Sequence, residues 1–314
     1  MDTVSVIVPT WNARDRLARC LEALNAQAHP VDQTIVVDNH STDGTVQFVR
    51  RQFSSVHLVS LPQNRGTAGA WNAGLHVATG SYIAFLNNDA YPQPTWLGAL
   101  VDALEAQPEF GFAASRLLLA DGSGRIDSAG DGFDPRFGGV MLGHEQLDGP
   151  PFDQAREVFS ATGAACIYRR EVIEEVGGLD DSLFMYSDDV DLGFRARLWG
   201  YRCLYVPGAV VDHERGASAV RDSPAQVRLI YRNGLTVYLK NMPWPLMRPI
   251  WPQVLRAWAG AVRHAPHPGA AVWGVLEALW RLPDTLRKRR HIQRHRVASL
   301  EQLRALMTTG SAPL

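Results

Sequence analysis

The sequence predicts an α/β fold built on a mostly parallel sheet with helices on both faces. Three apolar runs carry this prediction: residues 4–8 (VSVIV), 34–37 (TIVV) and 82–86 (YIAFL). Helical patterns separate them, and each run ends in a cluster of polar side chains. Because open α/β sheets bind ligands at the carboxyl ends of their strands, these polar clusters are expected to form a site.

The first strand ends at Pro9, and the second ends where Asp38 begins the polar stretch DNHSTDG. Between them, residues 13–27 repeat apolar side chains at helical spacing, with arginines on the other face. A second helix is expected to open near Thr42 and to carry Val46 and Val49. The third strand ends on Asn87, Asn88 and Asp89, whose oxygens are suitable ligands for a hard cation.

Length and composition are typical of a globular enzyme. The chain has 314 residues, 46% of them hydrophobic and 20% charged, which fits one large domain with an extension. A net charge of −1 argues against nucleic acid as the main partner. The three cysteines are far apart and indicate free thiols in a reducing cytosol. The first strand begins at once, and no apolar run reaches the roughly 18 residues of a membrane span, so we expect a cytoplasmic protein.

A change in composition divides the chain into residues 1–240 and 241–314. The stretch NMPWPLMRPIWP, residues 241–252, has four prolines and two tryptophans, which neither a helix nor a sheet can accommodate throughout. Amphipathic helical patterns and a basic segment, residues 281–296, follow it. Two interpretations stay open for this extension. Its tryptophans and arginines could bind an anionic membrane surface, or its helices could pack on the first domain.

At residues 4–240 the motifs VSVIVPTWN, VVDNHSTDGT, NRGTAGAWNAG, FLNNDA and FMYSDDVDLGFRARLWGYR occur in this order. Together they resemble the family-2 inverting glycosyltransferases of the GT-A fold, in particular the rhamnosyltransferase-like branch. The resemblance implies transfer of rhamnose or a related hexose from a dTDP- or UDP-sugar donor. The acceptor would be a hydroxyl of a glycan or lipid-linked glycan in cell-surface polysaccharide synthesis, with Mn²⁺ or Mg²⁺ on the diphosphate. Such an enzyme would work in the cytoplasm, in one interpretation at the inner face of the membrane.

The resemblance also implies roles for the nucleotide-sugar residues. Asp38 would accept the imide N–H of uracil or thymine. The alternative is an Asx turn or a helix N-cap, a role for which Ser41 and Asp43 are equally suited. Because Trp71 stands where many relatives have an arginine, Arg65 and Arg232 are the candidates for neutralising phosphate, each against a structural alternative. The other residues expected around the donor are Pro9, Thr10, Asn12, Asn39, Gly66, Asn72 and Asn88.

Metal and base are assigned by the same resemblance. Asn87 replaces the first acid of the family's D-x-D motif, so Asp89 would hold the cation with the donor phosphates, and His213 would be a further ligand. Asp189 would be the general base. Acids in the first turn of a helix capped by Ser187 offer an alternative explanation, since they complement its dipole. Asp191 is expected to pair with Arg195 in a structural role.

The glycine-rich residues 117–158 are expected to form an irregular loop that lines the acceptor side together with residues 160–170. Two other functional classes stay open. A non-catalytic sugar-nucleotide or carbohydrate-binding module would have no use for Asp89, Asp189 and His213 together. A sugar-nucleotide nucleotidyltransferase would need a glycine-rich, basic phosphate loop after the first strand, where this chain has PTWNARD.

Overall fold

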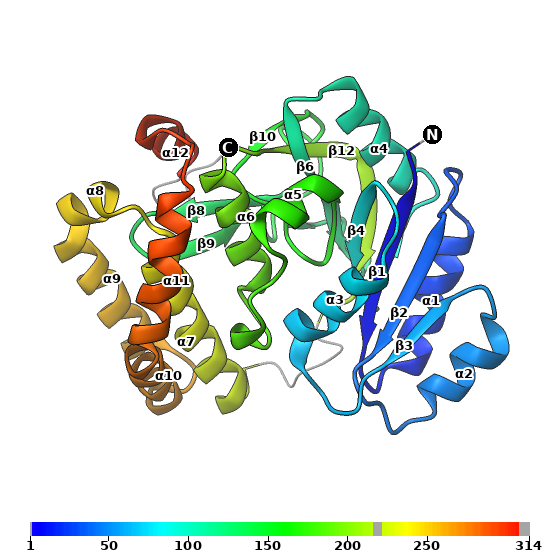
Figure 1. Ribbon diagram of the computed structural model, residues 1–314, viewed down its shortest axis with the longest axis horizontal. Coiled ribbons are helices and arrows are strands. Elements are labelled where there is room, and N and C mark those ends of the chain that lie inside the picture. Colours follow the sequence, from blue (N-terminus) through cyan, green and yellow to red (C-terminus); the bar gives the residue numbers. More distant parts are fainter. Residues whose placement is uncertain (1, 216–221, 308–314) are drawn as a thin grey trace.

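A ten-stranded mixed sheet forms the centre of the molecule in the computed structural model, which describes residues 2–215 and 222–307 (Figure 1). Eight strands follow the order β10-β12-β6-β11-β4-β1-β2-β3, with β5 paired to β12 and β7 to β6. Their bounds are β1 Val4–Thr10, β2 Gln33–Asp38, β3 His57–Ser60, β4 Tyr82–Leu86, β5 Ala90–Pro92, β6 Phe110–Leu119, β7 Ile126–Ser128, β10 Arg156–Val158, β11 Ala165–Arg169 and β12 Arg202–His213.

The strands β4, β1 and β2 are parallel neighbours, as the sequence predicts, and β3 adds a further parallel strand beside β2. Two of them run further than expected, because β1 continues through Pro9 to Thr10 and β2 through Asp38. Thr10 is aligned with Asp38 in the register, so the two polar ends lie side by side. The strand β11 is antiparallel to both of its neighbours, β4 and β6.

Helices cover both faces of the sheet, because side chains of successive strand residues point to opposite sides. One core contains Val4, Val6 and Val8 with the helices α1, α2 and α4; the other contains Ile7 and Phe85 with α3, α5 and α6. The predicted helices after β1 and β2 are both present. The bounds are α1 Arg14–Asn25, α2 Thr45–Gln52, α3 Gly66–Val77, α4 Trp96–Ala106, α5 Arg170–Val176, η1 Asp181–Leu183 and α6 Asp188–Leu198.

The prediction of an irregular loop over residues 117–158 is wrong. This segment forms β7, β10 and a separate antiparallel pair, β8 Asp131–Asp134 with β9 Gly138–Met141. Turns with positive φ at Gly122, Gly124, Gly130 and Gly143 allow the chain to reverse between these short elements. The glycines therefore mark turns of a compact β structure.

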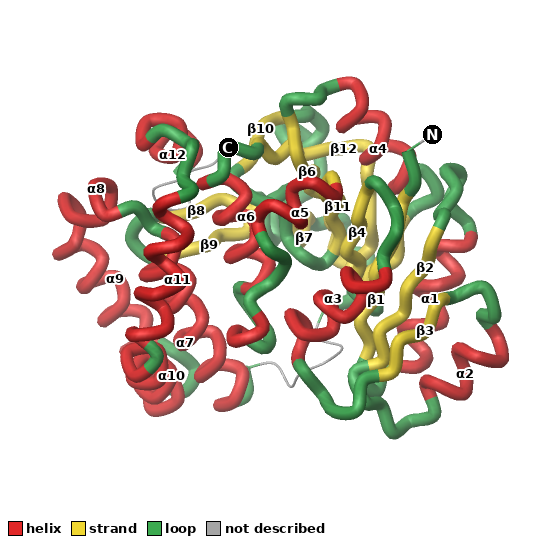
Figure 2. Tube along the Cα trace, viewed as in Figure 1, coloured by secondary structure: helices red, strands yellow, loops and turns green. Residues whose placement is uncertain are grey.

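The C-terminal helices lie together beside the first domain (Figure 2). They pack on it through a core that joins Phe133, Phe159 and Phe194 to Tyr238 and Trp258. Their bounds are α7 Pro224–Asn241, α8 Trp244–Met247, η2 Arg248–Ile250, α9 Trp251–His264, α10 Pro268–Trp280, α11 Leu282–Arg294 and α12 Leu300–Leu306. The helix α7 contacts α10 and α11, so the helical part begins before the predicted boundary at 241. Residues 308–314 of the predicted extension lie outside the described residues. Within residues 2–215 and 222–307, no helix combines the length and apolarity needed to cross a membrane.

Candidate active site

Asp38 lies at the end of β2 with its side chain buried. Its Oδ2 accepts a hydrogen bond from the Ser41 amide at 3.1 Å, as an Asx turn would. Its Oδ1 is also buried and has no hydrogen-bond partner among the described residues. A buried carboxylate oxygen without a donor is costly, and a ligand N–H would satisfy it.

Three asparagines that the sequence predicts around the nucleotide sugar connect the loops at the strand ends through their side-chain amides. Asn12 Oδ1 accepts from the Thr42 amide at 2.7 Å. Asn39 accepts from the Arg65 amide at 2.8 Å and donates to the Gly66 carbonyl at 3.0 Å. Asn88 donates to Thr10 Oγ1 at 2.9 Å. The structure thus brings Thr10, Asn12, Asn39 and Asn88 to one edge of the sheet, beside Pro9 in β1, where they shape the loops around Asp38.

The helix α3 contacts the segment around η1 through three predicted residues: Arg65 and Gly66 at its start and Asn72 in its middle. Arg65 forms an ion pair of 2.5 Å with Asp181, and Asn72 bonds both the carbonyl and the amide of Leu179. Gly66 has a φ of 70°, and a Cβ there would lie 2.0 Å from the Phe184 carbonyl oxygen. Only glycine allows this approach of α3 to the loop before α6.

Arg232, which the sequence offered as a phosphate ligand, has structural partners in α10 and η1. Its guanidinium is buried in the helical part, 3.1 Å from Glu277 of α10 and 2.7 Å from the Leu183 carbonyl. Burial of this cation is offset by the glutamate and by the carbonyl, which leaves it a structural role. We therefore do not assign Arg232 to the donor phosphates.

Asp89 and His213 meet because β5 pairs with β12, which aligns Ala90 with His213. The distance from His213 Nε2 to Asp89 Oδ1 is 3.4 Å. Burial alone would lower the pKa of His213, but its hydrogen bonds to Asp127 and Asp89 raise that pKa to about 9. An imidazole nitrogen and a carboxylate that face each other fit a divalent cation, which would displace the proton. Among residues 2–215 and 222–307, no group of three or more acids, histidines and cysteines could hold a metal, so a cation here needs ligands from the donor.

Sequence reasoning missed Asp127, which β7 places behind His213. Its Oδ2 lies 2.6 Å from His213 Nδ1, and its Oδ1 lies 2.7 Å from Arg215 Nε. The carboxylate thereby orients the ring so that Nε2 faces Asp89. Asp127 lies in a glycine-rich stretch with no recognisable motif, and only the pairing of β6 with β7 brings it to this site.

Asp189 stands in the first turn of α6, at the position that the sequence predicts. Its Oδ2 accepts from the Gly163 amide at 2.8 Å, and its Oδ1 accepts from the Val190 amide at 2.8 Å. Burial raises the pKa of Asp189 above its ordinary value despite these hydrogen bonds. Burial, with the adjacent charge of Asp189, raises the pKa of Asp188 well above its ordinary value. Both carboxyl groups therefore take up a proton more readily than an ordinary aspartate does.

The residues just before Asp188 and Asp189 have a strained backbone conformation. Phe184, Tyr186 and Ser187 all have positive φ, at 67°, 71° and 60°. Ser187 occupies the predicted N-cap position, but its side chain makes no capping hydrogen bond. The buried amide of Asn233 on α7 lies 2.9 Å from the Leu183 carbonyl, 2.7 Å from that of Met185 and 2.8 Å from that of Tyr186. Such backbone persists where surrounding contacts fix it, and Asn233 supplies them.

The predicted structural pair is confirmed, because Asp191 lies 2.8 Å from Arg195 Nε. Lys240 extends this pair into a network, at 2.7 Å from Asp191 and 2.5 Å from Asp180. Both carboxylates have a pKa below the ordinary value. Burial would raise it, but Lys240 and the other cationic partners outweigh that effect. The network fixes α6 to the end of α7.

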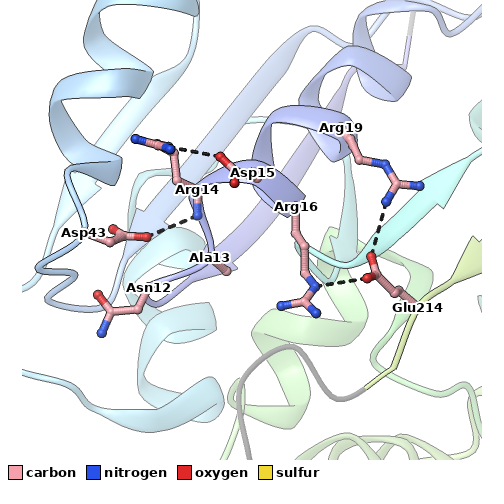
Figure 3. Close-up of a pocket in the computed structure, with 8 residues that line it drawn as sticks. All are labelled: Asn12, Ala13, Arg14, Asp15, Arg16, Arg19, Asp43 and Glu214. Atoms are coloured by element: carbon pink, nitrogen blue, oxygen red, sulfur yellow. Dashed lines mark hydrogen bonds and ion pairs between the residues drawn. The ribbon is translucent and has the colours of Figure 1, made fainter.

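A cavity of about 510 Å³ opens beside Asn12, at the start of α1 (Figure 3). Glu214, the residue after His213, enters it and pairs with Arg16 and Arg19, each at 3.4 Å. The cavity shares Asn12 with the predicted donor residues, but neither Asp38 nor Asp189 lines it. The remaining lining residues are Ala13, Arg14, Asp15 and Asp43.

Comparison with known proteins identifies the family. The model of glycosyl transferase family 2 matches residues 5–177, and that of glycosyl transferase family group 2 matches residues 148–283. The chain is 28% identical over 264 residues to the N-acetylglucosaminyl-diphospho-decaprenol L-rhamnosyltransferase of Mycobacterium tuberculosis, covering 76% of this chain and 85% of that protein. It is 30% identical over 241 residues to the O-antigen biosynthesis protein RfbC of Myxococcus xanthus, covering 70% of this chain but only 18% of RfbC.

Solved structures share the fold. The mannosyltransferase PcManGT of Pyrobaculum calidifontis, in complex with GDP-Man and Mn²⁺, has a TM-score of 0.55 at 24% identity and covers 94% of this chain and 84% of that one. TarS of S. aureus, in complex with UDP, has a TM-score of 0.54 at 18% identity and covers 97% and 83%. The mostly parallel sheet with its flanking helices is therefore of the GT-A type, and the chain belongs to glycosyl transferase family 2.

Proposed function

We propose that this protein is an inverting glycosyltransferase that transfers rhamnose or a related hexose from a dTDP- or UDP-sugar. The acceptor is a hydroxyl of a glycan or lipid-linked glycan in cell-surface polysaccharide synthesis. One observation carries the proposal: the adjacent residues Gly163 and Ala164 connect Asp189, the general base, to the end of β4 that precedes the metal ligand Asp89. The Gly163 amide donates to Asp189 at 2.8 Å, and the Ala164 carbonyl accepts from the Asn87 amide at 2.9 Å, two residues from Asp89.

The reaction needs these two groups on opposite sides of the transferred sugar. Asp189 takes the proton from the acceptor hydroxyl while that oxygen attacks the anomeric carbon and the bond to the diphosphate breaks. Its raised pKa brings its basicity closer to what proton transfer near neutral pH requires. Inversion follows from a single displacement without a covalent enzyme intermediate.

The buried Oδ1 of Asp38 supports a pyrimidine base, because the imide N–H of uracil or thymine is a donor of the kind that this oxygen lacks. Asp89 and His213 would hold Mn²⁺ or Mg²⁺, which when bound neutralises the leaving diphosphate. Arg65 remains a candidate for phosphate contact, provided that it leaves Asp181. The M. tuberculosis relative, by its name, transfers rhamnose to a sugar on a decaprenyl diphosphate, which favours a lipid-linked acceptor here.

The test is incubation of the full chain with a panel of nucleotide sugars and Mn²⁺, scoring donor hydrolysis and transfer. We expect turnover of a dTDP- or UDP-sugar and its loss in Asp189→Asn. Binding of nucleotide sugars without any turnover would favour a non-catalytic binding module. Formation of a sugar nucleotide from a sugar phosphate and a nucleoside triphosphate would favour a nucleotidyltransferase.

A further inference from the structure

The helix α10 exposes its large apolar side chains and buries its small ones. Val272, Trp273, Leu276, Leu279 and Trp280 follow helical spacing along one side and are 46% to 81% exposed. A helix that served only to pack on the domain would turn this side inward. We call these five residues the α10 stripe.

The buried side of α10 explains this orientation. Ala271, Gly274 and Ala278 face the molecule, and α10 packs on α7. A Cβ at Gly274 would lie 2.3 Å from the Arg228 carbonyl oxygen, so α10 approaches the backbone of α7 closely. Small residues favour this packing and leave the α10 stripe exposed. The helix α10 itself lies at the edge of the helical part, away from the central sheet (Figure 1).

The positive charge around the α10 stripe indicates what kind of partner binds it. Residues 241–314 hold eleven of the 31 Lys and Arg residues but only three of the 32 Asp and Glu residues, although the whole chain has a net charge of −1. The neighbouring helices α9 and α11 add exposed apolar residues, among them Leu255 and Leu286. They also carry exposed arginines, which are Arg256, Arg263, Arg287, Arg290 and Arg294. Trp and Leu flanked by arginine are typical of helices that lie in a membrane interface.

We propose that the α10 stripe and these arginines form a surface that docks on an anionic lipid bilayer. A second copy of this chain fits the surface less well, because self-association would bring two strongly basic helical segments together. The acidic remainder of the chain would be repelled by the same bilayer, which sets the orientation of the molecule on it.

This orientation has a consequence for the reaction, which rests on the function proposed above. At the end of the stripe, Arg281 donates to the Ser182 carbonyl at 3.0 Å, and Ser182 precedes the strained loop that leads to Asp189. The bilayer would then lie on the side of the molecule that holds this loop. An acceptor sugar on a membrane lipid would be presented to the base from that side.

The proposal is tested by sedimentation of the full chain with vesicles of phosphatidylcholine alone or mixed with phosphatidylglycerol, without donor or acceptor. We expect binding to the mixed vesicles and release by about 0.5 M NaCl, because salt screens the arginines. Trp273→Ala/Trp280→Ala should bind at least about tenfold more weakly. Leu147→Ala, which changes a residue 66% exposed on the sheet domain, is the matched control and should bind normally.

Absence of binding to anionic vesicles, or equal binding of the double variant and the wild type, would overturn the proposal. A dimer in light scattering that Trp273→Ala/Trp280→Ala converts to a monomer would also overturn it, in favour of self-association. Turnover of the donor with a soluble acceptor is measured on the same preparations. Since the vesicle assay contains no substrate, failure of the proposed function and failure of the surface are distinguishable.

Discussion

His213 is held by Asp127 on one ring nitrogen and faces Asp89 with the other, at 2.6 Å and 3.4 Å. The three residues come from β12, β7 and the turn after β4, so the sheet itself aligns them. The first prediction concerns this alignment. Asp127→Asn should weaken Mn²⁺-dependent binding of UDP or dTDP by about tenfold to a hundredfold, because the imidazole loses the carboxylate that orients it.

Calorimetry with Mn²⁺ and with EDTA measures this effect. Asp89→Ala should have a larger effect, since it removes the anionic ligand itself, and Asp121→Asn, an exposed acid on the turn before β7, is the matched control. If nucleotide binding by the wild type proves indifferent to EDTA, the metal assignment of Asp89 and His213 fails.

Nucleobase selectivity depends on Asp38. We expect UDP or dTDP to bind about tenfold to a hundredfold more tightly than GDP or ADP, the worth of one charge-assisted hydrogen bond. In Asp38→Asn the side-chain oxygen can still accept the hydrogen bond from the Ser41 amide. The new side-chain NH₂ group then points toward the base, where it repels the imide N–H. That variant should lose the preference while its affinity for GDP changes little. Equal affinity of the wild type for all four nucleotides would contradict the assignment.

Asp189→Asn separates chemistry from binding. The amide keeps the shape of the side chain but cannot take a proton, so kcat should fall by about 10² to 10⁴ while nucleotide and metal affinity stay near normal. Asp188→Asn should cost less in kcat. Initial rates with a fixed acceptor decide the point, and an Asp189→Asn enzyme with most of its kcat would move the assignment to Asp188.

Asn233 tests whether the helical part positions the base. Asn233→Ala removes the side-chain donor of the Met185 and Tyr186 carbonyls, while the Leu183 carbonyl keeps its contact with Arg232. The free energy of unfolding should therefore fall by about 1–3 kcal/mol. The substitution should also lower kcat with little change in the donor KM, because the loop before Asp189 relaxes. Thr236→Val is the control: this hydroxyl, one turn on, bonds only the Arg232 carbonyl within α7 in the described structure. Equal kcat values for Asn233→Ala and the wild type would leave Asn233 with a purely structural role.

Acid should weaken the contact between α6, α7 and α11. The pKa of Asp180 and that of Asp191 are depressed in the folded chain, so their contribution to stability is complete above the unfolded value of about 3.9. It is lost as the pH falls below that value and the carboxylates take up protons. Urea unfolding between about pH 6 and 3 should show this loss as a fall in the free energy of unfolding. Lys288 Nζ lies 2.7 Å from Asp180, so in Lys288→Gln the free energy of unfolding should fall less steeply with pH. Arg287→Gln removes only an exposed pair with Asp284 in the described structure. This variant should show the same pH dependence of the free energy of unfolding as the wild type.

The sequence by itself determined the parallel strands β1, β2 and β4 and the polar residues at their ends. Apolar runs and helical periodicity are local signals, and they place Asp38, Asp89, Asp189 and His213 at the ends or beginnings of elements without knowledge of the fold. Ordered motifs were enough to predict the GT-A type of sheet, which the solved structures confirm.

Tertiary structure alone decided which distant residues meet. Asp127 reaches His213 because β7 pairs with β6, and Arg232 is held in the helical part because Glu277 of α10 pairs with it. The orientation of α10 is likewise set by the close approach of Gly274 to α7. Periodicity shows that a helix has a large and a small side, but only its packing partner determines which of the two is buried.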